Sequence, residues 1–123
     1  MKRIALLPLL LAACATVPPQ TDGIARARLG QTVYVDGPRV TPLKVLSDSR
    51  CPMEARCVWA GTVELAVRIK LGSRTQLATL KLGEPFPVAD GTLELTDVMP
   101  PRSTQRAIKP RDYRFGLRFA GGL

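Results

Sequence analysis

Apolar and polar residues alternate with a period of two along most of the chain from Gln31 onward, and turn residues interrupt the alternation at short intervals. Such alternation is typical of half-buried β-strands, and no stretch keeps a helical period beyond one turn. The pattern therefore predicts an all-β domain, a small antiparallel β-sandwich or open barrel of about six or seven strands. The predicted strands cover residues 32–36, 40–48, 57–71, 74–82, 86–89, 92–98 and 112–120.

The longest predicted strand covers residues 57–71. Its odd-numbered residues, Cys57 and Trp59 among them, form the face that we expect to lie in the core. The Gly-Ser pair at residues 72–73 predicts a two-residue hairpin to the next strand. On that next strand Leu77 has the opposite parity to the other apolar residues, which indicates a bulge or a partly two-sided strand.

Two further turns are predicted where small or rigid residues separate apolar runs. Asp90-Gly91 joins two short strands, and Gly37-Pro38 joins the first two strands of the domain. Pro42 lies inside the second of these strands and marks an edge or a bend, because proline donates no hydrogen bond to a sheet.

A short leader precedes the domain. Lys2 and Arg3 are followed by the uncharged run 4–13, which is typical of a secretory signal. A membrane-spanning helix needs roughly 20 apolar residues, so this run is too short for a permanent anchor.

The uncharged run ends in Leu-Ala-Ala-Cys at residues 11–14, a tetrad that resembles the lipobox of bacterial lipoproteins. The resemblance implies that the preceding peptide is cleaved and the cysteine is lipidated. The next residue is Ala15 and not aspartate, which by the sorting rule of such lipoproteins implies the outer membrane, with the domain facing the periplasm. The alternative is an ordinary signal peptide with a cysteine placed there by chance.

These features divide the chain into three parts. We expect residues 1–13 to be the cleaved signal peptide, and residues 14–28 to comprise lipidated Cys14 and a flexible tether. Residues 29–123 are then a single β-domain, anchored to the membrane through the lipid.

Charge and composition restrict the chemistry. The 123 residues carry 18 basic and 10 acidic side chains, and because Lys2 and Arg3 lie in the leader, the remainder has a net charge of +6. The chain contains no histidine, which excludes Ser-His and Cys-His catalytic pairs and His-ligated metal sites. The acidic residues are scattered singly. We therefore expect a protein that is not an enzyme, with no catalytic residues, no metal ligands and no cofactor.

Two cysteines remain once Cys14 is lipidated. Cys51 and Cys57 would then lie in an oxidising compartment and form a disulfide. The ring that they close has seven residues, and such a ring stabilises a fold by about 2.4 kcal/mol in the chain-entropy model. A redox-active pair is the alternative, but those motifs usually place two residues between the cysteines, whereas five intervene here.

The densest local pattern is the sequence DSRCPMEARCVWAG at residues 48–61. It resembles a motif of a family of small uncharacterised bacterial lipoproteins. The shared pattern is Asp-Ser-Arg-Cys-Pro, four variable residues, Cys, one residue, Trp, one residue and Gly. The resemblance implies a compact β fold and no established activity, so no functional residue is transferred from it.

Several residues of this segment have more than one interpretation. We expect Trp59 to pack against the disulfide in the core, and the alternative is an exposed stacking platform. The residues between the two cysteines form a constrained, exposed loop in which Glu54 and Arg56 lie at the tip and could enter the cleft of a partner. Arg50 either forms a salt bridge with Asp48 or contacts an anion.

Basic residues are concentrated near the C-terminus. If Arg114 and Arg118 share the outer face of a strand, a positive stripe results that suits phosphate or carboxylate partners. In the inferred compartment these are anionic lipids, lipopolysaccharide, peptidoglycan or acidic proteins, and we expect no nucleic acid. We favour the simpler interpretation of a solvated face. The group comprises Arg102, Arg106, Lys109, Arg111, Arg114 and Arg118, with only Asp112 of opposite charge among them.

The sequence supports two hypotheses of function. The first is a non-enzymatic binding or accessory module, anchored to the membrane at the cell envelope, whose partner is an envelope protein or an anionic envelope polymer. The second is an inhibitor of an envelope or cell-wall hydrolase that uses the loop between Cys51 and Cys57.

Overall fold

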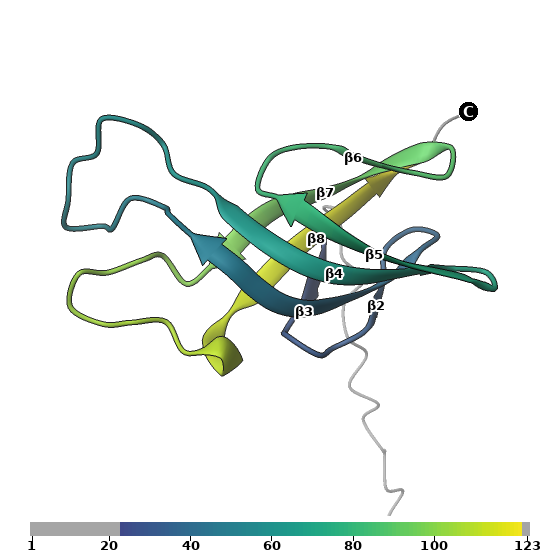
Figure 1. The fold of residues 1–123 in the computed structure, drawn as a ribbon, viewed down its shortest axis with the longest axis horizontal. Coiled ribbons are helices and arrows are strands. Elements are labelled where there is room, and N and C mark those ends of the chain that lie inside the picture. Colours follow the sequence, from purple (N-terminus) through teal and green to yellow (C-terminus); the bar gives the residue numbers. More distant parts are fainter. Residues whose placement is uncertain (1–22, 122–123) are drawn as a thin grey trace, which may run out of the picture.

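The computed structural model describes residues 23–121 of the chain. These residues form two four-stranded antiparallel sheets packed face to face, and the sheets do not close into a barrel (Figure 1). This confirms the predicted all-β sandwich. The expected signal peptide 1–13 and lipidated Cys14 lie outside the described residues. Among residues 23–121, no helix has the length and apolar character needed to cross a bilayer.

Each sheet is named here by its two central strands. The β3–β4 sheet has the order β2-β3-β4-β5, with β2 at Val33–Tyr34, β3 at Arg39–Asp48, β4 at Val63–Leu71 and β5 at Arg74–Lys81. The β7–β8 sheet has the order β1-β8-β7-β6, with β1 at Ala25–Ala27, β6 at Phe86–Val88, β7 at Gly91–Met99 and β8 at Arg114–Ala120.

The core lies between the two sheets and follows the alternation of the sequence. On β4 the odd-numbered residues from Val63 to Ile69 are buried, and on β8 Phe115 and Leu117 are fully buried. The ring of Tyr113 stacks on that of Phe115 with the centroids 5.6 Å apart. The buried apolar residues are Ala27, Val35, Val40, Val63, Leu65, Val67, Ile69, Leu80, Val88, Leu93, Leu95, Val98, Tyr113, Phe115 and Leu117.

Strand β4 is shorter than the alternation predicts. It begins at Val63 and not at Cys57, because its neighbour β3 ends at Asp48, which is the residue paired with Val63. Residues 57–62 therefore have no neighbouring strand in the described part of the chain. The prediction that Trp59 packs in the core is wrong, since its side chain is 74% exposed.

The predicted tether 14–28 extends too far. Its residues Ala25–Ala27 form β1, which pairs with β8 so that Ala25 lies opposite Leu117. Ala27 is 1% exposed and belongs to the core. Three residues are too few for an alternation to be recognised in a sequence, so only the partner strand reveals this one.

The structure refines two predictions about the hairpins. The second hairpin turns at Ala89 and Asp90, while Gly91 is the first residue of β7. Gly91 is needed for close approach, because a Cβ there would overlap the carbonyl oxygen of Ala120. Of the two alternatives for Leu77, the structure shows the partly two-sided strand and no bulge, since β4 and β5 pair without a register shift and Leu77 points to the outer face.

Strand β3 bends where the sequence predicts it. Its pairing with β4 shifts register between Pro42 and Lys44 and again between Val45 and Ser47. The carbonyl of Pro42 accepts a hydrogen bond from the N–H of Gly30 at 2.7 Å, so the bend also positions the segment that follows β1.

The burial of β1 makes a test possible. We predict that Ala27→Asp destabilises the domain by about 3 kcal/mol or more, because it places an unpaired charge in the core. The neighbouring change Arg28→Ala, at an exposed side chain, should cost less than about 0.5 kcal/mol. Urea denaturation followed by circular dichroism measures both. Equal stabilities would contradict the placement of β1 in the folded domain.

Candidate functional site

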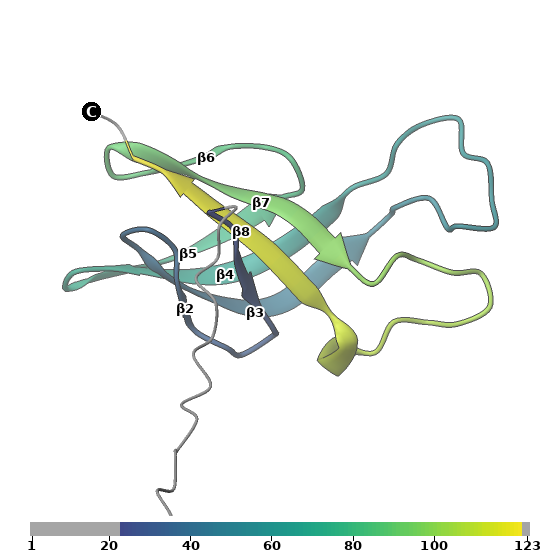
Figure 2. The ribbon, with the colours of Figure 1, turned by 180° about the vertical axis from the view of Figure 1, so that it is seen from behind.

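Two long loops lie side by side at one end of the sandwich (Figures 1 and 2). The disulfide loop, residues 49–62, joins β3 to β4, and the C-terminal loop, residues 100–113, joins β7 to β8. The C-terminal loop includes a 3₁₀ turn at Pro110–Asp112. Each loop extends one of the two sheets, so contacts between the loops also connect the sheets.

An ion pair lies at the base of the disulfide loop. The Nε and Nη2 of Arg50 donate to the two carboxylate oxygens of Asp48 at 2.9 and 2.8 Å. The side chain of Arg50 is 15% exposed and that of Asp48 is 10% exposed. Of the two interpretations of Arg50, the structure shows the salt bridge to Asp48, in the two-pronged geometry that favours arginine over lysine.

The same guanidinium reaches the other sheet. Its Nη1 donates to the carbonyl of Val98 at 2.7 Å and its Nη2 to the carbonyl of Pro100 at 3.0 Å. The hydroxyl of Tyr113 donates to Asp48 at 3.0 Å. The end of β3 is thus bound to the end of β7 and to the residue that precedes β8.

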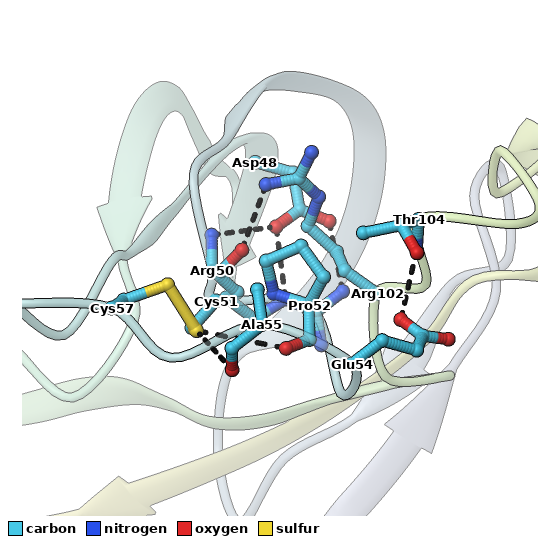
Figure 3. The surroundings of a disulfide bond; sticks show 9 residues. All are labelled: Asp48, Arg50, Cys51, Pro52, Glu54, Ala55, Cys57, Arg102 and Thr104. Carbon is cyan, nitrogen blue, oxygen red and sulfur yellow. Dashed lines mark hydrogen bonds and ion pairs between the residues drawn. A yellow bond between two sulfur atoms is a disulfide. The ribbon is translucent and has the colours of Figure 1, made fainter.

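A second set of hydrogen bonds joins the two loops farther out (Figure 3). The Nη1 of Arg102 donates to the carbonyl of Arg50 at 2.7 Å, and the N–H of Met53 donates to the carbonyl of Arg102 at 3.0 Å. Each loop therefore supplies a donor and an acceptor to the other, which fixes the position of the disulfide loop near its first cysteine.

Glu54 points toward the C-terminal loop and not toward a partner. Its carboxylate accepts hydrogen bonds from the hydroxyl of Ser103 at 2.5 Å and from the N–H of Thr104 at 2.9 Å. Glu54 is exposed on the loop, as predicted, but its carboxylate is held by the C-terminal loop. Arg56, the other residue predicted at the tip, has an exposed side chain.

The ionisation states follow from these contacts. Burial raises the pKa of Asp48, but hydrogen bonds from Arg50 and Tyr113 and the charge of Arg50 outweigh burial, so the pKa lies below its ordinary value. Burial and the hydrogen bond to Asp48 raise the pKa of Tyr113. A hydrogen bond from Ser103 is the main cause that lowers the pKa of Glu54. Near neutral pH the carboxylates are charged and the tyrosine is a hydrogen-bond donor.

The predicted disulfide is present. Cys51 and Cys57 are bonded, with their Cα atoms 5.9 Å apart. Between them the N–H of Ala55 donates to the carbonyl of Pro52 at 3.1 Å, which forms a turn inside the ring. The disulfide loop is therefore constrained both covalently and by the C-terminal loop.

Large apolar side chains are exposed on this constrained loop. Val58 is 94% exposed, Trp59 74% and Met53 65%. The alternative interpretation of Trp59, an exposed platform, is the one that the structure shows. Sequence reasoning placed Met53 in the exposed loop and Val58 opposite the predicted core face, but it did not single out either one as a site residue. The available signal was the end of β3 at Asp48, which leaves the residues after Cys57 without a strand to pair with.

A groove of about 550 Å³ lies between the loops. Met53 and Glu54 line it from the disulfide loop, and Pro100, Arg106 and Ile108 are among the residues that line it from the C-terminal loop. Met53 thus belongs both to the exposed apolar group and to the wall of the groove.

The last turn of the disulfide loop depends on a glycine. Ser49 and Thr62 exchange hydrogen bonds, from the N–H of Ser49 to the carbonyl of Thr62 at 2.8 Å and from the N–H of Thr62 to the hydroxyl of Ser49 at 3.0 Å. Gly61 therefore lies directly against the backbone of Ser49, where a Cβ would overlap the carbonyl oxygen. This close approach accounts for the glycine that ends the motif.

The basic stripe is interrupted by acidic side chains. Arg118 on β8 forms an ion pair of 3.0 Å with Glu94 on β7, and Arg26 on β1 lies 4.0 Å from Asp97. Asp112 is the only acidic residue near these arginines in the sequence, but strand β7 beside β8 places Glu94 against Arg118. This part of the surface therefore carries both charges.

Arg114 is held by the backbone next to it. Its Nη1 donates to the carbonyls of Arg111 and Tyr113 at 3.0 and 2.9 Å. Arg111 has an exposed side chain in the 3₁₀ turn. The three arginines proposed for binding, Arg111, Arg114 and Arg118, therefore do not converge on the groove between the loops, whose lining residues do not include them.

Comparisons with known proteins identify no relative: no family model, no curated protein and no solved structure matches the chain. Within residues 23–121, no three or more His, Cys, Asp or Glu residues come together as a metal-binding group.

The central ion pair leads to a prediction about stability. We expect Arg50→Met to cost about 3–5 kcal/mol at pH 7, because it leaves the Asp48 carboxylate buried without its cation. The exposed pair provides the control, since Arg118→Met should cost less than about 1 kcal/mol. Chemical denaturation followed by circular dichroism measures both changes.

The pH dependence of the stability lost in Arg50→Met tests whether the unpaired Asp48 carboxylate is its cause. With its lowered pKa, Asp48 stabilises the native chain above the ordinary carboxyl pKa of about 4, and this contribution is lost as the pH falls through the lowered value. In Arg50→Met, burial raises the pKa of Asp48, so acid removes the buried charge. The difference in unfolding free energy between the two chains should therefore be smaller at pH 3 than at pH 7. A constant difference would contradict the role assigned to the ion pair.

The glycine that ends the motif gives a further prediction. Gly61→Ala should destabilise the domain by about 2–4 kcal/mol, because the new methyl group meets backbone that cannot rotate away. Gly83→Ala is the matched control, since Gly83 has a φ of +80° but open space around it, and should cost about 1 kcal/mol. Thermal and urea denaturation compare the two, and equal costs would refute the close approach at Ser49.

Proposed function

We propose that this protein is an envelope lipoprotein whose β-domain binds a protein partner through the exposed apolar end of the disulfide loop. The observation that supports the proposal is the exposure of Val58 and Trp59 on a segment whose backbone is constrained by the disulfide and by the C-terminal loop. The domain acts in this proposal as a binding module and not as an enzyme, and it requires no cofactor.

The energetic argument concerns both the side chains and the backbone. Tryptophan is enriched among the residues that dominate protein–protein binding, and arginine, here the exposed Arg56, is a second such type. A loop that is already ordered loses little conformational entropy when it binds. Here the disulfide from Cys51 to Cys57 and the hydrogen bond from Arg102 to Arg50 supply that order before any partner arrives.

The cellular location in this proposal rests on the leader. The lipobox-like residues 11–14 would anchor the chain through Cys14 to the outer membrane, with the domain facing the periplasm. The disulfide supports a compartment that is oxidising. Arg111 remains a candidate contact for an acidic protein or an anionic envelope polymer, whereas nucleic acid is not a partner in this proposal.

An inhibitor of an envelope or cell-wall hydrolase is the second candidate. The observation that favours it is the double constraint on the disulfide loop, which suits a segment that enters the cleft of an enzyme. Because Glu54 is bound to Ser103 and Thr104, the residues that would enter the cleft are Val58 and Trp59, with Arg56 beside them.

The proposal can be tested by photo-crosslinking in living cells. A photoreactive amino acid at Val58 should give one discrete adduct with a partner protein, and Trp59→Ala in the same chain should reduce that adduct by about tenfold or more. The domain itself should be unaffected, because replacing so exposed a side chain changes the unfolding free energy by less than about 0.5 kcal/mol.

Tyr34 provides the matched control. It is also an exposed aromatic residue, at 63%, but it lies on β2. The photoreactive amino acid at Tyr34 should not give the adduct, and Tyr34→Ala should not reduce the adduct formed at Val58. Adducts that are equal at the two positions, or that survive Trp59→Ala unchanged, would contradict the proposal.

A further inference from the structure

The two sheets have four edge strands, and they differ greatly in length. Strands β1, β2 and β6 have two or three residues, whereas β5, Arg74–Lys81, has eight. A long edge strand presents a row of backbone donors and acceptors that another strand can pair with. Charged side chains protect β5 only at its two ends, since residues 75–80 carry none.

One hydrogen bond determines which residues of β5 present these groups. The N–H of Leu82 donates to the carbonyl of Val63 at 3.0 Å, one step beyond the pairing of β5 with β4. Hydrogen-bonded pairs alternate along an antiparallel ladder, so the even-numbered residues of β5 direct their backbone groups to β4. The odd-numbered residues Thr75, Leu77 and Thr79 direct theirs away from it.

These outward groups are without a partner in the part of the chain that the structure describes. No described strand pairs with the far side of β5, and no backbone hydrogen bond outside the sheets involves Thr75, Leu77 or Thr79. The side chain of Leu77, in the middle of the strand, is 72% exposed on the outer face of the sheet. An exposed leucine and free backbone groups therefore coincide at the centre of the long edge.

We propose that β5 is a dimerisation edge that pairs antiparallel with β5 of a second copy of this chain. Only the odd-numbered residues of β5 present outward backbone groups. A symmetric pairing must therefore place odd-numbered residues of one copy opposite odd-numbered residues of the other. The register centred on the strand places Leu77 opposite Leu77 of the second copy. Three such pairs, each exchanging two bonds, would form about six backbone hydrogen bonds and join the two β3–β4 sheets into one.

The side chains are self-complementary in this register. Thr75 lies opposite Thr79 of the second copy, a pairing of hydroxyl side chains that is favourable across strands. Arg74 lies opposite Leu80, and Lys81 lies opposite Ser73, so no charged residue faces a like charge. The two exposed leucines cover each other. A second copy is favoured over an unrelated strand because these pairs match along the whole edge and the two-fold arrangement is closed.

Cysteine crosslinking tests both the surface and the register, on the full chain under mild oxidation. In the proposed dimer the two Cα atoms of residue 77 are about 5.5 Å apart, within the range of a disulfide. The two copies of residue 75, or of residue 79, are about 14 Å apart, which a disulfide cannot span.

We therefore expect Leu77→Cys to crosslink as a homodimer. Thr75→Cys and Thr79→Cys should not do so separately, but a mixture of the two chains should. The chain without an added cysteine gives the background crosslinking through Cys14, and this background is subtracted. Absence of the Leu77→Cys dimer, or equal crosslinking at the three positions, would overturn the proposal.

Sedimentation of the full chain tests the same interface without a crosslink. The native chain should pass from monomer to dimer as its concentration rises, and Leu77→Lys should weaken the dimer by about tenfold or more, because two like charges would then face each other. Val58→Lys is the matched control: it adds the same charge on the disulfide loop and should leave the dimer unchanged.

A native chain that remains monomeric at every concentration would overturn the proposal and leave β5 open to a strand of another protein. A dimer that Leu77→Lys does not weaken would place the interface elsewhere. The result is independent of the proposed partner binding at Trp59, because the two experiments change different loops and strands.

Discussion

The buried ion pair of Arg50 and Asp48 is the interaction on which the loop end of this sandwich depends. One guanidinium binds a carboxylate at the end of β3, the carbonyl of Val98 on the other sheet and the carbonyl of Pro100 in the C-terminal loop. Removing such a charge pair from water is costly and is repaid only when every donor finds an acceptor. These contacts connect the ends of the two sheets and hold the two loops together.

Further contacts between the two loops extend outward from this ion pair. Arg102 and Glu54 continue the polar contacts outward, and the disulfide closes the ring beyond them. Val58 and Trp59 are therefore exposed on a loop whose backbone is held in place by these contacts. Elsewhere on the surface the arginines of β8 are balanced by neighbouring contacts, such as that of Arg118 with Glu94. The constrained apolar end is therefore the more distinctive surface.

Much of the fold could be predicted because the long strands are periodic. Strand β4 alternates over enough residues to define its inner face, and Leu93 and Leu95 do the same for β7. Strand β1 could not be predicted, because three residues give no period and Ala27 becomes a core residue only through its partner β8. Trp59 was misplaced for a related reason, since the alternation continues beyond the point where β3 stops.

Alternation and cysteine content are local properties of the chain, so the class of fold, the cysteine pair and the side chains that share a face can be derived from them. Whether a face is covered depends on how the strands and sheets pack. Trp59 and Leu77 are as apolar as the core residues, yet both are exposed, because among residues 23–121 no strand lies beside Trp59 and no sheet packs on the face that carries Leu77. Likewise Arg50 could be expected to meet Asp48, but its contacts with Val98 and Pro100 join residues about 50 positions apart. Contacts of that kind arise from the packing of the two sheets and leave no local pattern in the sequence.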